Sequence, residues 1–172
     1  HSDYIRHLRG GLTERLETLH RHKGIVVSGG SNYDPIGPYG DAWEALVGYD
    51  LFRRLNRSYP EICMLPICFS FQRMAEIIRR NLGLRIELTQ QALEFGPMVF
   101  QQHQQSLAKI LPSGAPNKFT AVNTHSWFVV DERKGEEFKG SRDTFCPTLR
   151  SHTNSMAGYS ALNGFIQGFQ FH

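Results

Sequence analysis

The sequence has 172 residues, 40% of them hydrophobic and 20% charged, which is the size and composition of one globular domain with a sizeable core. Its net charge of +3 comes from basic residues spread along the chain, which argues against the concentrated basic face of a nucleic-acid-binding protein. No apolar run reaches the length of a membrane span and no signal peptide is visible, so we expect a cytoplasmic protein that binds no membrane.

The cysteines and glycines exclude several kinds of site. Cys63, Cys68 and Cys146 are odd in number and irregularly spaced, which argues against a disulfide framework and against a cysteine-based zinc site. The pair Gly29-Gly30 lacks the Lys-Ser/Thr that a phosphate-binding loop needs. We therefore expect reduced thiols, no metal and no cofactor.

The first part of the chain predicts alternating strands and helices. Residues 24–28 are a compact, mostly β-branched run that is typical of a buried parallel strand, and residues 31–40 are rich in Gly, Pro, Asn and Asp and predict a loop. Asp41 has the side chain of an N-cap for a helix over about residues 42–56. A second apolar strand over residues 62–66 then completes the crossover unit of a parallel sheet.

The rest of the chain predicts shorter elements. Strands are expected at 84–88, 98–100, 119–122 and 127–130, a charged hairpin or loop at 131–142, and a final aromatic-rich strand at 164–172. Residues 153–163 are mostly small and polar and carry no assignment. The fold class is therefore α/β, an open, mostly parallel, flavodoxin-like sheet flanked by helices, with a small antiparallel strand region in the second half.

Cys68 lies where the second strand passes directly into a stretch of helical periodicity. Such a turn exposes its residue at the carboxyl end of the sheet, where open α/β proteins place their chemistry. The helix start lowers the pKa of a thiol at the turn, and the N–H of Phe69 can donate to an oxyanion. The alternative is a small buried cysteine that ends a core strand.

Several segments resemble the class I glutamine amidotransferase family. Gly-Ile-Val-Val-Ser-Gly-Gly at 24–30 is similar to the family's oxyanion strand, and Pro-Ile-Cys-Phe-Ser-Phe-Gln at 66–72 to its nucleophile motif, Gly-Ile-Cys-x-Gly-His-Gln. Residues 94–97 resemble its Glu-x-Gly segment, and residues 123–125 its second His-containing strand. Ile-Gln-Gly-Phe-Gln-Phe-His at 166–172 is most similar to the catalytic Gly-x-Gln-x-His stretch. The nearest type is a γ-glutamyl peptidase-like member without a synthetase domain.

The resemblance implies a cysteine hydrolase or amidotransferase that acts on a small molecule, glutamine or a γ-glutamyl compound. Cys68 would attack the γ-carbonyl, and His172 would act first as general base and then as the acid that protonates the departing ammonia or amine. The sequence identifies neither an oligomeric state nor a partner that would accept ammonia.

Other site residues follow from the same resemblance. The N–H groups of Gly30 and Phe69 would bind the oxyanion. Gly29 and Gln72 would form or support the substrate site, and His125 matches a structural family position. Residues 1–172 would be a single domain that lacks the family's first strand and the residues after the catalytic histidine, including its acidic partner.

The nucleophile motif departs from the family pattern. Pro66 and Ser70 replace the two glycines that flank the cysteine, and Phe71 replaces the usual histidine. Three interpretations therefore stay open: an active hydrolase, a catalytically inactive family member that serves as a binding or regulatory domain, and an unrelated flavodoxin-like binding domain.

Overall fold

One mixed seven-stranded sheet, with strand order β1-β2-β7-β6-β4-β3-β5, organises the part of the chain that the structure describes. The structure is a computed structural model, and it describes residues 14, 17–18, 21–29, 34–47, 54, 57–58, 62–102, 118–131, 145–151, 155–162 and 164–170. Within these residues, no helix has the length and apolar character needed to cross a membrane.

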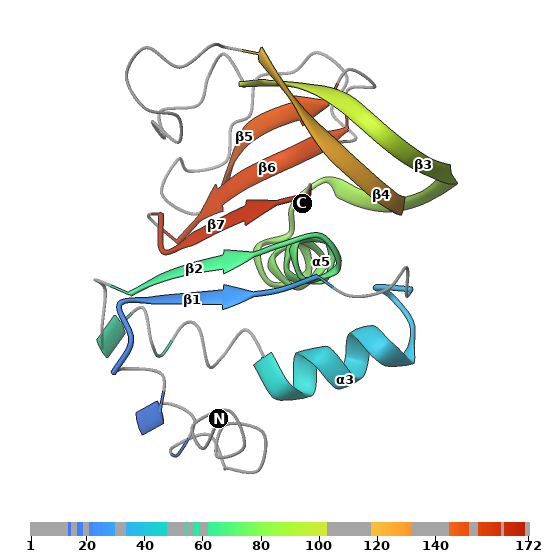
Figure 1. Cartoon of the computed structure of the whole chain (residues 1–172). Helices are drawn as coiled ribbons and strands as arrows, with labels where there is room; N and C mark the ends of the chain where they lie inside the picture. The colour runs from blue at the N-terminus through green and yellow to red at the C-terminus, as the bar shows by residue number, and fades with distance from the viewer. Residues whose placement is uncertain are drawn as a thin grey trace.

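Three parallel strands form one side of the sheet. β1 (Gly24–Val27) pairs with β2 (Cys63–Pro66), and β2 pairs with β7 (Ile166–Phe169). Their arrows point the same way in Figure 1, toward the end at which α5 begins. The α/β class and the predicted strands at 24–28, 62–66 and 164–172 are thus confirmed, with the last shorter than expected.

The antiparallel part is larger than the small region expected. β3 (Ile86–Gln102) and β4 (Lys118–Asp131) pair along most of their length, so each merges two predicted short strands into one. β5 (Phe145–Ser151) and β6 (Met156–Ala161) pair with each other, and β5 also pairs with β3 and β6 with β4 and β7. Hydrogen bonds to a neighbouring strand on each side stabilise these strands, although their side chains alone predict a strand only weakly.

Two helices accompany the sheet. α3 (Pro38–Val47) begins with a proline, which lacks the N–H that a first helical residue leaves unpaired. The prediction of Asp41 as the N-cap is wrong, since this residue lies inside the first turn. α5 (Phe69–Leu82) ends at Gly83, whose φ of 64° is a left-handed cap. Residues 48–53 and 55–56 of the longer predicted helix lie outside the described residues.

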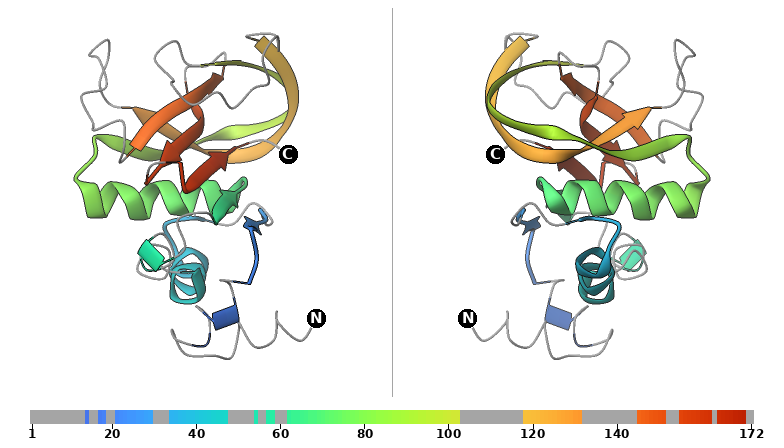
Figure 2. Two further views of the ribbon diagram at one scale, coloured as in Figure 1. Left: turned by 90° about the vertical axis from the view of Figure 1, so that its left-hand side faces the viewer. Right: turned by 90° about the vertical axis from the view of Figure 1, so that its right-hand side faces the viewer.

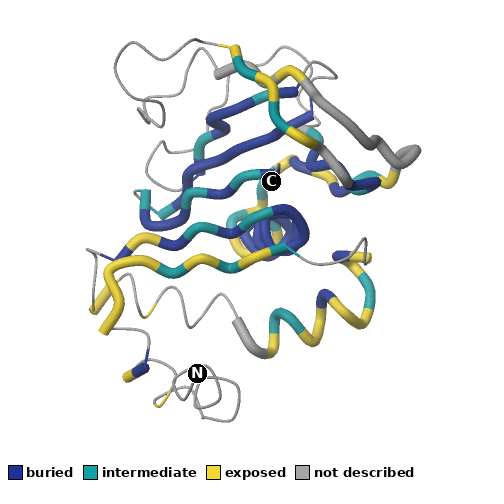
Figure 3. The backbone as a smooth tube through the Cα atoms, viewed as in Figure 1, coloured by how far each residue is buried: buried dark blue, intermediate teal, exposed yellow. Residues whose placement is uncertain are grey.

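The core lies between α5 and the sheet. Figure 2 shows α5 running between the antiparallel strands and α3, and Figure 3 shows most of α5 fully buried whereas β1 is partly exposed. The first ten residues of α5 are all buried, so the turn at Cys68 leads into a helix that the core holds firmly. The main core side chains are Ile62, Met64, Phe71, Met74, Ile77, Ile78, Phe145, Tyr159 and Ile166.

Candidate active site

Cys68 forms a strained turn between β2 and α5. Its φ is 54° and its ψ is −114°, a backbone conformation that residues with a side chain rarely adopt. It is the N-cap of α5, although its side chain makes no capping hydrogen bond. A non-glycine residue in this conformation between a strand and a helix is the geometry of a nucleophile elbow.

The ends of two neighbouring strands flank this turn. The N–H of Ile67 donates to the carbonyl of Val27, the last residue of β1, at 3.0 Å. The N–H of Cys68 donates to the carbonyl of Phe169, the last residue of β7, at 2.8 Å. The cysteine therefore lies between the carboxyl ends of β1 and β7, the strands after which the sequence analysis expects an oxyanion donor and the general base.

Pro66 is accommodated in β2, but one backbone hydrogen bond between β2 and β7 is lost. The N–H groups of Met64 and Cys68 donate to the carbonyls of Phe165 and Phe169 at 2.7 and 2.8 Å. Successive backbone N–H groups of β2 point alternately toward β1 and toward β7. Residue 66 lies midway between Met64 and Cys68, so its N–H would also point toward β7. Proline has no N–H, so the approach to the turn is one hydrogen bond weaker than an all-donor strand.

The environment of the Cys68 sulfur raises the pKa of the thiol. Only 5% of the residue is exposed, and this burial disfavours the thiolate. The backbone N–H of Phe69 hydrogen-bonds to the sulfur and lowers the pKa, but burial has the larger effect. The net direction is opposite to the one expected from the helix start alone. A thiolate at this position therefore needs a nearby proton acceptor.

Ser70, where the resembling motif has glycine, uses its hydroxyl both as donor and as acceptor. Its Oγ–H donates to the carbonyl of Ser28 at 2.7 Å, and its Oγ accepts the Nε1–H of Trp43 at 3.0 Å. These bonds join the first turn of α5 to the residue after β1 and to α3. The Ser70 hydroxyl, which a glycine would lack, thus links α5 to α3 and to the residue after β1.

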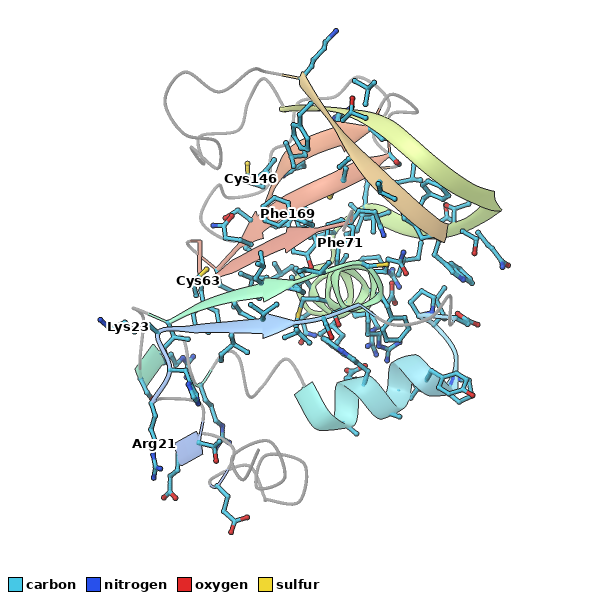
Figure 4. The ribbon with its side chains drawn as sticks, in the orientation of Figure 1. Arg21, Lys23, Cys63, Phe71, Cys146 and Phe169 are labelled. Atoms are coloured by element: carbon cyan, nitrogen blue, oxygen red, sulfur yellow. The ribbon has the colours of Figure 1, made fainter. Side chains whose placement is uncertain are left out.

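Phe71, where the resembling motif has histidine, belongs to the core. Its ring lies 4.8 Å from that of Tyr159, centre to centre, and the Tyr159 hydroxyl donates to the Phe71 carbonyl at 3.1 Å. Figure 4 shows Phe71 on α5 beside β7. A Cβ at Gly168 of β7 would come within 2.8 Å of Tyr159 and 2.9 Å of Phe71. The glycine of the Gly-x-Gln-x-His stretch is therefore required by these two rings.

Gln72 and Gln170 lie together under the turn. The amide Nε2–H of Gln72 donates to the carbonyl of Trp127 in β4 at 2.9 Å and to Oε1 of Gln170 at 3.3 Å. Only 2% of Gln72 is exposed, so it fastens α5 to two strands from within the structure. His125 is also buried, 4.6 Å from the ring of Phe128. Gly29 is half-buried and follows Ser28.

Two predicted site residues, Gly30 and His172, lie outside the described residues. Gly30 is the next residue after Gly29, and His172 is three residues beyond Phe169, whose carbonyl binds the Cys68 N–H. Cys63 is at the start of β2, the opposite end from Cys68, and Figure 4 also shows Cys146 away from α5.

Arg73 is a buried cation at the site that the sequence analysis missed. Its guanidinium donates to the Pro35 carbonyl at 2.8 Å, to Asp41 at 2.9 Å and to Glu44, although only 3% of it is exposed. The available signal was a single Arg in an otherwise uncharged helix start, preceded by two carboxylates spaced i, i+3, one at the predicted N-cap and one in the first turn of the predicted earlier helix. Buried charges of this kind need partners.

Solved structures similar to this chain identify the fold. A candidate GMP synthase subunit from Thermoplasma acidophilum is 19% identical, with a TM-score of 0.54 and coverage of 91% of this chain and 66% of that one. A glutamine amidotransferase from Thermotoga maritima is 17% identical, with a TM-score of 0.58 and coverage of 96% and 59%. A glutamine amidotransferase from Methylobacillus flagellatus is 16% identical, with a TM-score of 0.55 and coverage of 96% and 54%. This chain has a class I glutamine amidotransferase-like fold.

The comparisons establish the fold and leave the activity to be proposed. No protein-family model matches the chain, and no curated protein matches it in sequence. The glutamine amidotransferase-like chain spans between 54% and 66% of the length of the three similar structures. One fold hosts many functions, so the chemistry of this chain depends on the turn at Cys68 and its neighbours.

Proposed function

We propose that this protein is a cysteine hydrolase that cleaves the γ-amide of glutamine or of a γ-glutamyl compound. The observation that carries the proposal is the backbone of Cys68, strained at φ 54° and held between the ends of β1 and β7. Strain of this kind persists only where the surrounding structure enforces it, and it is concentrated at functional sites.

The proposed reaction has two steps. In the first, His172 takes the thiol proton as Cys68 forms a sulfur–carbon bond to the γ-carbonyl, and the N–H groups of Gly30 and Phe69 stabilise the oxyanion. The carbon–nitrogen bond then breaks and the proton goes to the departing ammonia or amine. In the second step, His172 takes a proton from the water that attacks the thioester carbon, the carbon–sulfur bond breaks to release the γ-carboxylic acid, and this water-derived proton passes from His172 to the sulfur.

Two further residues would support the substrate. Gly29 is the second residue after β1 and lacks a side chain that would obstruct a bound γ-carbonyl. Gln72 would support the pocket through its bonds to Trp127 and Gln170. The raised pKa of the Cys68 thiol supports the need for a base, because the isolated thiol would be mostly protonated at neutral pH.

A catalytically inactive binding or regulatory domain is the second candidate. The burial of the Cys68 sulfur favours it, because a thiol with a raised pKa and little exposure is a poor nucleophile when it is alone. In this case the alkylation rate of Cys68 should be low at pH 7 and should rise with pH. A thiol paired with an imidazole should instead react rapidly already at neutral pH.

The test is the intact mass after exposure to a chloroketone analogue of glutamine at pH 7. We expect a single adduct on the wild type, none on Cys68→Ala and a rate at least about tenfold lower on His172→Ala, since a general base contributes that much or more. Cys63→Ala is the matched control, because it removes an exposed thiol at the far end of β2 and should keep the adduct. A folded wild type that forms no adduct would establish the inactive alternative.

A further inference from the structure

Two side chains of α5 fasten both ends of the segment that follows β1. Ser70 donates to the carbonyl of Ser28 at 2.7 Å, and Arg73 donates to the carbonyl of Pro35 at 2.8 Å. Positions i and i+3 lie on the same face of a helix, so both contacts come from one face of α5. Between the two fastened carbonyls lie six residues, among them Gly30, which carries the proposed oxyanion donor.

Both contacts are supported from behind by α3. Trp43 donates its Nε1–H to the Ser70 Oγ, and the carboxylates of Asp41 and Glu44 bind the Arg73 guanidinium. The hydroxyl of Ser70 therefore uses its one donor on Ser28 and is oriented by the indole. The charge of Arg73 is neutralised in place, which leaves its Nη1–H directed at Pro35.

A close backbone approach shows that the second contact is built tightly. A Cβ on Gly40 would lie 2.1 Å from the Pro35 carbonyl oxygen and 3.0 Å from Nη1 of Arg73. Only glycine fits at this position, so the first turn of α3 presses the Pro35 carbonyl against the guanidinium. The Asp34 side chain adds a local turn by accepting the Ile36 N–H at 2.8 Å.

We infer that Ser70 and Arg73 are positioning residues: they hold the carbonyls of Ser28 and Pro35 in place beside α5, and Ser28 lies two residues before Gly30, whose N–H is the proposed oxyanion donor. The inference rests on the proposed function. It also reverses the simple interpretation of the altered motif: in this chain Ser70 assists the elbow, and a return to the family's glycine removes a support. Oxyanion donors act through their geometry, so a displacement of about 1 Å lowers the rate up to about a hundredfold.

The experiment compares two reactions of the same thiol in Ser70→Ala. Hydrolysis of γ-glutamyl-p-nitroanilide needs the oxyanion donors, whereas alkylation by iodoacetamide displaces iodide and forms no oxyanion. We expect kcat to fall about ten- to a hundredfold with KM changed less than about threefold, while the alkylation rate of Cys68 changes less than about twofold. Equal loss in both reactions, or an unchanged kcat, would overturn the inference.

Three companion variants keep the test decisive. Trp43→Phe leaves the Ser70-to-Ser28 bond in place and should lower kcat less than Ser70→Ala; an equal loss would mean that packing, and not the bond, matters. Arg73→Lys keeps the positive charge but loses the planar guanidinium that binds Pro35, Asp41 and Glu44 together. It should also lower kcat more than it lowers the alkylation rate of Cys68. Ser155→Ala removes a buried serine–serine hydrogen bond of 2.7 Å next to β5 and should leave kcat unchanged.

The two proposals fail in distinguishable ways. A wild type that neither hydrolyses the anilide nor forms the chloroketone adduct refutes the proposed function, and the positioning role falls with it. An active wild type whose Ser70→Ala and Arg73→Lys variants are equally active refutes the positioning role alone.

Discussion

Gly168→Ala places one methyl group between two aromatic rings that cannot move apart. The new Cβ would lie 2.8 Å from Cζ of Tyr159 and 2.9 Å from Cδ2 of Phe71, both well inside van der Waals contact. Both rings are fully buried, and the Tyr159 hydroxyl is bonded to the Phe71 carbonyl, so neither ring has free space into which it can turn.

The expected cost is in the upper part of the range for an overpacked core. Insertion of a methyl group into a well-packed interior typically destabilises by about 1–3 kcal/mol, and the fixed rings place this site at about 2–3 kcal/mol. For a domain of this size, each kcal/mol lowers Tm by about 2–4 °C, so we expect a decrease of about 4–12 °C.

Urea denaturation and thermal unfolding of the purified variant measure both quantities. Gly24→Ala in β1 is the matched control, because its Cβ would lie an ordinary 3.6 Å from the Cys63 carbonyl and should change stability by less than about 0.5 kcal/mol. The double variant Gly168→Ala/Phe71→Leu should be less destabilised than the sum of the two single variants. A Gly168→Ala protein as stable as the wild type would refute the description of this contact.

The same aromatic pair gives two further predictions. Burial raises the pKa of Tyr159 well above its ordinary value, so the unfolded chain ionises first and stability should fall above about pH 10 by up to about 1.4 kcal/mol per pH unit. Tyr159→Phe should be less stable at pH 8 but lack this part of the alkaline slope in urea titrations at pH 8 and 11; an unchanged slope would contradict the assignment. Phe71→His introduces the residue of the motif that this stretch resembles; it should destabilise by about 2–4 kcal/mol because it buries an imidazole against the Tyr159 ring, and it should restore no activity. A stable and more active variant would show that the histidine finds a polar partner there.

The parallel strands were predictable because their sequences are locally unambiguous. Residues 24–28 and 62–66 are apolar runs with clear ends, and the helical period after Cys68 marks α5. β6 was missed because four of its six residues are Ala, Gly or Ser and the strand shows no alternation, yet all six are buried. Gly158 shows the reason for the small residues in β6. A Cβ there would lie 2.8 Å from the Thr148 Oγ1, so the close packing of β6 requires a small residue, and small residues give a weak strand signal in the sequence.

The site was predictable only where its residues lie close together in the sequence. The motif around Cys68 indicated the elbow, and the strained φ of the cysteine agrees with it. The partners of Ser70 and Arg73 could not be foreseen, because they depend on contacts between residues separated by 27 to 42 positions in the sequence. The roles of Gly30 and His172 stay predictions.

The backbone of Cys68 has a consequence for how this sequence balances folding against chemistry. At φ 54° and ψ −114°, any side chain costs about 1–3 kcal/mol, whereas glycine adopts the same angles freely. A sequence optimised only to fold would carry glycine at the N-cap of α5. The exchange of cysteine for alanine would remove the sulfur and keep the backbone strain, whereas an exchange for glycine would remove both.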